Sequence, residues 1–249
     1  MNTMRKLVLF DIDGTLVLTG GAGIRAMNRA CEELVGRAQA LEGIPVAGRT
    51  DRIILTDVLA RAGQSLNDGL LEQLRDRYVA YLRTEIEQPG RVQSFESLGP
   101  RSGIKAVMPG IRELLQILEQ REDVLLGLLT GNFEAGARIK LEHFDLWRYF
   151  RCGAFGDDSA DRNDLVPFAV DRARQCGLDA IDASRIFVVG DTPHDVACAR
   201  AVGAVPVAVA TGGFTSDQLR ESGADVVYET LADPAPFLEL LDRTESRID

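Results

Sequence analysis

The chain has 249 residues, 45% of them hydrophobic, and a formal net charge of −10. This length fits one large domain or a core domain with an insert, and the apolar content is sufficient for a packed core. The acidic balance argues against nucleic acid or an anionic membrane as the main partner. A small anionic substrate remains compatible with it, because a metal and a few basic groups can set the charge of one pocket.

The cysteines and the N-terminal segment bear on the cellular compartment. Four widely spaced cysteines form no C-x-x-C pair and are accompanied by only two histidines. This pattern disfavours a zinc site and favours free thiols in a reducing compartment. The apolar run 7–10 is too short for a signal peptide or a membrane span. We therefore expect a cytoplasmic protein, a monomer or a homodimer, that contacts neither membrane nor nucleic acid.

The first predicted element is a strand over residues 6–10, followed directly by Asp11 and Asp13. Alternate residues of a strand point to the same side, so these two carboxylates can share one face at the strand's carboxyl end. Two close carboxylates repel each other unless a cation or a proton separates them. The pair therefore indicates a site for a divalent metal.

The next stretch predicts helices rather than strands. Residues 16–23 are rich in glycine and indicate a flexible loop. Apolar positions at helical spacing then predict helices over 24–35, 51–62 and 67–87. The sequence Gly-Pro-Arg-Ser-Gly at 99–103 is typical of a linker. Residues 18–103 are therefore expected to form an all-helical insert with hinge linkers.

From residue 107 onward, predicted helices and short strands alternate. Helices are expected over 110–120, 134–143, 165–176, 193–202, 215–222 and 236–241, and strands over 124–129, 151–155, 185–189, 205–209 and 225–228. Such alternation predicts an α/β fold with a doubly wound parallel sheet. The first strand must join this sheet, so residues 1–17 and 104–249 would form the core. The helical insert would then lie over the sheet's carboxyl edge and could act as a lid.

Two further strands end in polar residues. The strand over 124–129 is followed by Thr130, Gly131 and Asn132, whose hydroxyl and backbone N–H groups at a helix start can bind an anion. The strand over 185–189 is followed by Asp191 and Asp195. The segment 192–195 is also typical of a helix start with a threonine cap and proline in the first turn, and both interpretations can hold together.

These three strand ends together resemble the motifs of the haloacid dehalogenase superfamily, in particular its phosphatases with a helical cap inserted after the first motif. Asp-Ile-Asp-Gly-Thr-Leu at 11–16 resembles the nucleophile motif, Leu-Leu-Thr-Gly-Asn at 128–132 the second motif, and Gly-Asp-Thr-Pro-His-Asp at 190–195 the acidic fourth motif. The family's remaining motif is a basic residue, most often lysine. Arg162 is the candidate here, and Lys140 is its rival.

The resemblance implies a Rossmann-like core and a magnesium-dependent phosphatase that works through an aspartyl-phosphate. Asp11 would be the nucleophile, and Asp13 would protonate the leaving oxygen and later activate water. Magnesium suits an all-oxygen site that retains waters. The implied metal ligands are the Asp11 side chain, the Asp13 carbonyl and Asp191, with Asp195 as a ligand or an orienting neighbour; the implied phosphate-binding residues are Thr130, Gly131, Asn132 and Arg162.

The substrate is expected to be a small phosphorylated metabolite such as phosphoglycolate, a sugar phosphate or a nucleotide. In the insert, Arg49 lies in a loop of small residues before a helix capped by Thr50 or Asp51, and it could contact the leaving group. A phosphomutase acting on a hexose phosphate would use the same residues. Carbon–halogen hydrolysis would leave Asp13 and the metal carboxylates unexplained, and a non-enzymatic binding protein would be expected to carry broken motifs.

Overall fold

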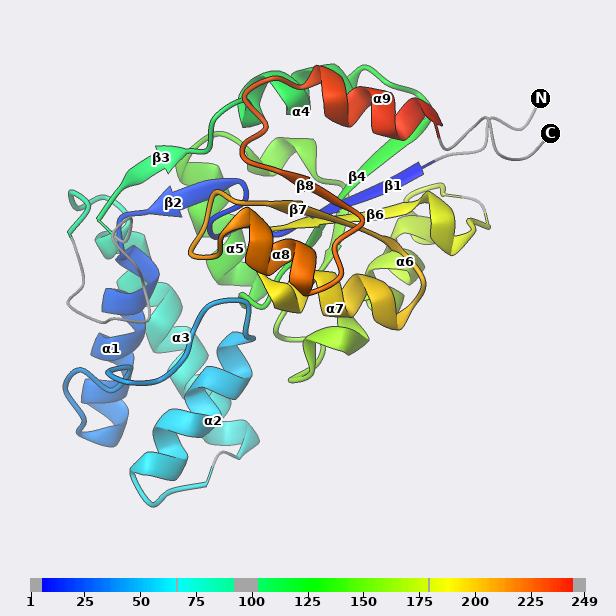
Figure 1. The fold of residues 1–249 in the computed structure, drawn as a ribbon. Helices are drawn as coiled ribbons and strands as arrows, with labels where there is room; N and C mark the ends of the chain where they lie inside the picture. Colours follow the sequence, from blue (N-terminus) through cyan, green and yellow to red (C-terminus); the bar gives the residue numbers. More distant parts are fainter. Residues whose placement is uncertain (1–5, 66, 92–102, 179, 244–249) are drawn as a thin grey trace.

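The computed structural model describes residues 6–65, 67–91, 103–178 and 180–243. Its central feature is a sheet of six strands in the order β5-β4-β1-β6-β7-β8, and every neighbouring pair is parallel (Figure 1). The strands are β1 (Lys6–Phe10), β4 (Val124–Leu129), β5 (Cys152–Ala154), β6 (Ile186–Gly190), β7 (Val205–Val209) and β8 (Val226–Tyr228). The predicted α/β class with a parallel sheet is confirmed.

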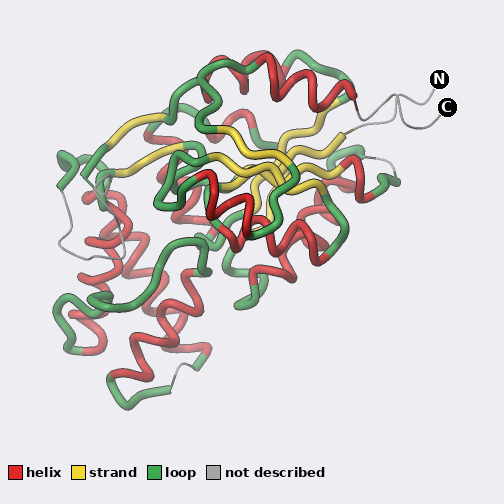
Figure 2. Tube along the Cα trace, viewed as in Figure 1, coloured by secondary structure: helices red, strands yellow, loops and turns green. Residues whose placement is uncertain are grey.

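Helices cover both faces of this sheet, as Figure 2 shows for the strands enclosed between helical layers. On one face lie α4 (Ile111–Glu119), α5 (Glu134–His143) and α9 (Ala235–Arg243), which pack against Val8 and Phe10 of β1. On the other lie α6 (Leu165–Gln175), α7 (Pro193–Ala201) and α8 (Ser216–Glu221), with Leu7 and Leu9 facing α6 and α7. Alternate residues of β1 thus serve opposite layers, which explains its continuous apolar run.

Short 3-10 turns complete the core: η2 (Trp147–Tyr149), η3 (Arg162–Asp164) and η4 (Ala183–Arg185). Of these, η3 bears most directly on function because it directly precedes α6 and carries the buried Arg162. Among the described residues, no helix is long and apolar enough to cross a membrane.

A second, two-stranded sheet connects the core with the inserted helices. It pairs β2 (Val17–Thr19) with β3 (Lys105–Val107) in antiparallel register. The prediction of a loop over 16–23 was wrong here, because residues 17–19 form a strand and a helix begins at Ala22. The pairing joins segments far apart in sequence, and a strand of three residues has almost no periodicity of its own.

The inserted segment contains α1 (Ala22–Val35), α2 (Asp51–Arg61) and α3 (Asp68–Glu85). These helices share a separate apolar cluster, which also includes Phe133 and Ile139 of the core. Figure 1 shows this helical unit beyond the end of the sheet to which β2 and β3 lead. Most of the expected linker 99–103 lies outside the described residues, and the expected boundary at 17/18 falls within β2.

Candidate active site

The site forms where β1, β4 and β6 end side by side. Strand β1 pairs with both β4 and β6, and the hydrogen bond from the Asp11 N–H to the Val189 carbonyl, 2.9 Å, continues the pairing one residue beyond β1. The carboxyl ends of these three parallel strands therefore bring Asp11, Thr130 and Asp191 to one edge of the sheet. All three side chains are buried. The convergence expected from the sequence is present.

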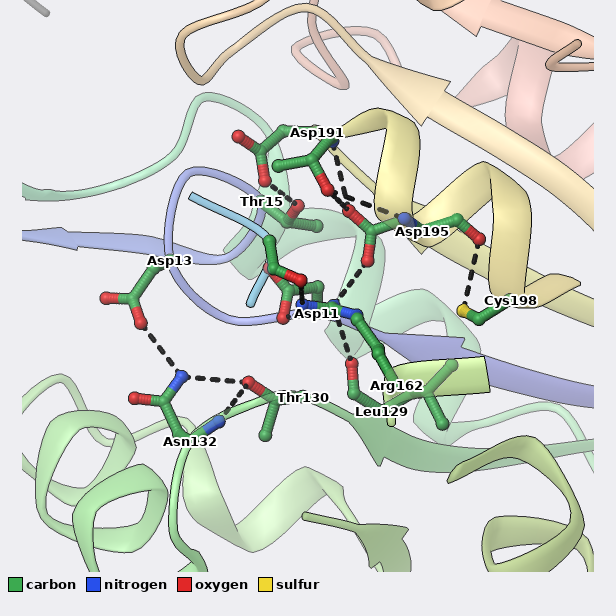
Figure 3. Close-up of polar contacts among 12 residues, drawn as sticks. Asp11, Asp13, Thr15, Leu129, Thr130, Asn132, Arg162, Asp191, Asp195 and Cys198 are labelled. Atoms are coloured by element: carbon green, nitrogen blue, oxygen red, sulfur yellow. Dashed lines mark hydrogen bonds and ion pairs between the residues drawn. The ribbon is translucent and has the colours of Figure 1, made fainter. Parts of the chain in front are cut away.

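Three carboxylates form a buried acidic cluster at this edge. Asp11, Asp191 and Asp195 each offer an oxygen atom, and these atoms lie within 4.8 Å of one another (Figure 3). Burial raises the pKa of Asp11 to about 6 against the partly compensating charge of Arg162, and Asp195 adds to the rise. Burial and the charge of Asp11 likewise hold the pKa of Asp191 well above its ordinary range. A divalent cation would relieve this repulsion, so the donor set fits a hard metal ion.

The three carboxylates differ in how many hydrogen bonds they accept from the protein. The Thr15 hydroxyl donates to Asp191 Oδ1 at 3.2 Å. Both oxygens of Asp195 are engaged: Oδ2 accepts from the Thr192 N–H at 3.0 Å and hydroxyl at 2.7 Å, and Oδ1 accepts from Arg162. This pattern suits Asp195 as a neighbour that orients the cluster more than as a direct ligand.

Asp195 also takes part in the start of α7. Thr192 caps this helix, Asp195 closes a capping box with it, and Pro193 occupies the first turn. The helix-start interpretation of 192–195 is therefore correct, and it coexists with the site because one carboxylate serves both. A helix cap thus fixes the position of a charged group in the active site.

Arg162 lies between two of these carboxylates. Its Nη2 donates to Asp11 Oδ1 at 2.9 Å and to Asp195 Oδ1, and its Nη1 donates to the Gly48 carbonyl at 3.0 Å (Figure 3). Burial alone would lower the pKa of Arg162, but Asp195 and Asp11 raise it well above its ordinary value. The guanidinium therefore remains charged and is the basic group nearest the expected nucleophile.

The loop after β4 carries the expected phosphate-binding residues. Asn132 Nδ2 donates to the Thr130 hydroxyl at 2.8 Å and to Asp13 Oδ2 at 2.9 Å. At Gly131, a Cβ atom would lie 2.2 Å from the Arg49 carbonyl, so only glycine lets the helical unit approach this loop. Thr130, Gly131 and Asn132 all line the same cleft as Asp11.

Lys140 does not contact Asp11. It is buried in α5, and its Nζ lies 2.5 Å from Asp13 Oδ2 and 2.5 Å from Asn132 Oδ1. Asp13 itself is 44% exposed at its side chain. The two basic candidates thus divide between the two aspartates of the first motif: Arg162 with Asp11 and Lys140 with Asp13.

The helical unit is docked on the core through residues 48–51. Thr50 caps α2 and donates to the Ala160 carbonyl at 2.8 Å. The Asp51 N–H donates to the Gly131 carbonyl at 2.7 Å, and Asp51 Oδ2 accepts from the Phe133 N–H at 2.9 Å. The sequence did not identify the buried Asp51 as part of this contact. The only hint was its place beside a helix cap.

Arg49 lines the cleft, but its guanidinium is held within the helical unit. Its Nη2 donates to Asp57 at 2.8 Å and its Nη1 to the Pro45 carbonyl at 3.0 Å. The cleft has a volume of about 710 Å³ and extends from Asp11 to Tyr78 on the helical unit and to Arg220 on the core. Arg49 thus lines the cleft, while its guanidinium bonds to Asp57 and Pro45 rather than to the acidic cluster.

Comparison with known proteins identifies the class. The family model for haloacid dehalogenase-like hydrolases matches residues 8–200, and the chain belongs to this family. The match spans all three strand ends that carry the site. The enzyme class expected from the sequence, a phosphatase-type hydrolase, is confirmed.

Two of the relatives share about a quarter of their residues with this chain over nearly its whole length. The chain is 27% identical over 243 residues to the phosphoglycolate phosphatase of Agrobacterium fabrum, covering 96% of both chains. It is 27% identical to IndB of Dickeya dadantii, named as a probable phosphatase, covering 92% of both.

Solved structures share the fold. A Haemophilus somnus protein described as a predicted phosphoglycolate phosphatase superposes with a TM-score of 0.66 at 18% identity, covering 96% of this chain and all of the other. A Bacteroides vulgatus protein assigned as a β-phosphoglucomutase gives 0.66 at 17% identity, covering 98% of this chain and 91% of the other. At these identities the likeness concerns architecture alone.

Proposed function

We propose that the protein is a magnesium-dependent phosphatase that hydrolyses a small phosphorylated metabolite through an aspartyl-phosphate on Asp11. The observation that carries this proposal is the position of Asp11: buried at the end of β1, beside two further carboxylates within 4.8 Å, and in contact with Arg162. A carboxylate in such a place can attack phosphorus while positive charge neutralises the phosphoryl oxygens.

The residues of this chain divide the chemistry among them. Asp11 Oδ forms a bond to phosphorus as the bond from phosphorus to the leaving oxygen breaks, and Asp13 gives that oxygen a proton. Asp13 then accepts a proton from the water that displaces Asp11 from phosphorus. Arg162 and the Thr130–Asn132 loop hold the phosphoryl oxygens.

The proposed magnesium site uses the Asp11 and Asp191 side chains and the Asp13 carbonyl. Asp195 orients the cluster through Arg162 and Thr192. When bound, the metal neutralises phosphoryl charge and keeps Asp11 ionised. The fit rests on the buried carboxylates themselves, whose oxygen atoms lie within 4.8 Å of one another. Burial and the neighbouring carboxylates raise the pKa values of Asp11 and Asp191, which a bound cation would offset.

The substrate proposal rests on the relatives and on the cleft. Relatives such as that of Agrobacterium fabrum are named phosphoglycolate phosphatases, which makes phosphoglycolate the first candidate. A cleft of about 710 Å³ falls in the range that accommodates drug-sized ligands, so sugar phosphates and nucleotides are tested together with phosphoglycolate. Arg49 is the proposed contact on the helical unit, which would act as a cap over the site.

The test is phosphate release from a panel of phosphate esters, with magnesium and with a chelator. We expect activity that needs magnesium and is lost in Asp11→Asn. An absence of release from every ester, with magnesium present, would contradict the proposal. Transfer of phosphate between positions of one hexose, without release, would instead identify a phosphomutase.

A further inference from the structure

Lys140 is a buried cation that contacts Asp13, the residue proposed for proton transfer, and Asn132 of the proposed phosphate-binding loop. It is 4% exposed, and its Nζ contacts Asp13 Oδ2 and Asn132 Oδ1, each at 2.5 Å. Removing an ammonium group from water is costly unless charged or polar groups replace the lost hydration. Here the Asp13 carboxylate and the Asn132 amide oxygen replace the lost hydration, so the buried ammonium group depends on these two partners.

Asp13 is held from two elements at one oxygen. Its Oδ2 accepts from Asn132 Nδ2, at 2.9 Å, in the loop after β4 (Figure 3). The same oxygen accepts from Lys140 on α5. Asn132 is itself fixed by Thr130, and Asp13, Asn132 and Lys140 form a closed triangle of contacts. A side chain that is 44% exposed would otherwise rotate freely. The triangle therefore selects one orientation of the carboxylate.

The helical unit covers the ammonium group. At Gly23 of α1, a Cβ atom would lie 3.5 Å from Lys140 Nζ and 3.7 Å from the Tyr78 hydroxyl of α3. Lys140 also acts electrostatically on Asp51 of α2, whose carboxylate accepts from the Phe133 N–H. All three helices of the unit thus contribute a residue near this cation.

We propose that Lys140 is a positioning residue that orients Asp13 for proton delivery to the leaving oxygen, rather than a ligand of the phosphoryl group. The inference rests on the proposed phosphatase function. As the bond from phosphorus to the leaving oxygen breaks and that from Asp11 to phosphorus forms, the proton passes from Asp13 to the leaving oxygen. Lys140 neither gains nor loses a proton in this step; it sets the direction of the Asp13 carboxyl group.

Leaving groups of different basicity test this role. An alkoxide needs a proton as it departs, whereas p-nitrophenolate is stable as an anion. Lys140→Met should therefore lower the rate of phosphoryl transfer to Asp11, measured in a single turnover, by about 100-fold for an alkyl phosphate, a typical contribution of general acid catalysis, and affect that rate for p-nitrophenyl phosphate far less. The dissociation constant of either ester should change little. Adding Asp13→Asn to Lys140→Met should lower the single-turnover rate on the alkyl phosphate little further, because both changes remove the same proton transfer.

Two further variants separate positioning from folding. Arg138→Met, on the exposed side of the same helix, removes a cation paired with Glu142 and should leave both activities unchanged. Lys140→Gln keeps a hydrogen-bond donor of similar length and should recover part of the loss; if Lys140→Met does not fold, the selective loss is measured in Lys140→Gln.

The outcomes distinguish this inference from the proposed function. Equal loss of the single-turnover rate on both esters, or a raised dissociation constant with an unchanged single-turnover rate, would overturn the positioning role and assign Lys140 to phosphoryl binding or general structure. A wild-type chain that releases no phosphate from either ester would overturn the proposed function itself.

Discussion

At the scale of single residues, the site is built on the balance between buried charges of opposite sign. Arg162 contacts both Asp11 and Asp195 and offsets part of their charge, and all three are buried. Removing one partner of a buried pair leaves the other charge without compensation. The basic residue of the site is therefore a structural requirement as well as a proposed phosphate ligand.

Arg162→Met should lower the free energy of unfolding by about 3–5 kcal/mol, since Asp11 and Asp195 would remain buried without their cation. Urea denaturation at neutral pH with a chelator measures this loss of stability. Arg174→Met is the matched control, because the exposed pair with Asp171 should contribute no more than about 0.5 kcal/mol. Equal losses in the two variants would contradict the structural role of Arg162.

Asp51 should make stability depend on pH. Burial raises its pKa from 3.8 to about 7, against the compensating charge of Lys140 and the Phe133 N–H, while Asp13 and Asp157 add to the rise. Between these values the folded chain binds more protons than the unfolded chain, so the free energy of unfolding falls as pH rises from about 4 to about 7. The group accounts for as much as about 4 kcal/mol of that fall.

Asp51→Asn keeps an acceptor for the Phe133 N–H and removes the titration. Its free energy of unfolding should fall less steeply over the same pH range, so the difference between wild type and variant should grow with pH. Denaturant unfolding at several pH values measures this difference, in which contributions from Asp11 and Asp191 largely cancel. Parallel curves for the two chains would show that Asp51 does not titrate in this window.

At the scale of elements, the ends of β1, β4 and β6 could be predicted from the sequence. The pairing of short strands far apart in the chain could not. Apolar runs mark β1, β4 and β6, and the parallel-sheet rule brings the polar residues after them together. By contrast, β2 and β3 depend on a partner about 90 residues away. A strand of three residues holds too few side chains for its pattern to be read.

The role of the basic residues could be predicted only in part. The sequence offered Arg162 and Lys140 as rivals for one position. In the structure both are close to the first motif, on different aspartates. Lys140 lies two turns along α5 from Asn132, and its reach to Asp13 depends on how α5 packs beside β1, which no local pattern encodes.

The capping box of α7 should affect catalysis as well as stability. Thr192→Ala should cost about 1 kcal/mol of stability, as cap removal generally does, and should also remove one of the three hydrogen bonds that Asp195 accepts from Thr192 and Arg162. Activity should then fall by about 10–100-fold, the usual effect of losing a group that orients a metal site. Phosphate release and urea denaturation of the same sample measure both effects.

Asn67→Ala provides the comparison for that prediction. Asn67 caps α3 and accepts from the Leu70 N–H at 2.9 Å, on the exposed surface of the helical unit. Its loss should destabilise the chain by a similar amount with little change in activity. If Thr192→Ala lowers activity no more than Asn67→Ala does, Asp195 does not depend on the cap for its function.

At the scale of the whole molecule, the core supplies the proposed chemistry and the helical unit supplies its surroundings. Contacts from Gly48, Thr50 and Asp51 dock the unit directly beside Arg162 and the loop after β4. The unit begins a few residues after Asp11 and Asp13, directly beyond β2. The docked helical unit therefore lies close to both aspartates, and the core and the unit together line one cleft.

Peptide mapping by mass spectrometry determines whether Asp11 becomes phosphorylated, the step on which the proposed mechanism depends. Asp13→Asn should slow hydrolysis of the intermediate, while p-nitrophenyl phosphate can still donate its phosphoryl group because its leaving group needs no proton. After acid quenching with magnesium present, we expect one phosphoryl group on the peptide that contains Asp11, and none when Asp11 is also replaced by Asn. A phosphoryl group on another residue, or wild-type turnover in Asp11→Asn, would disprove the proposed mechanism.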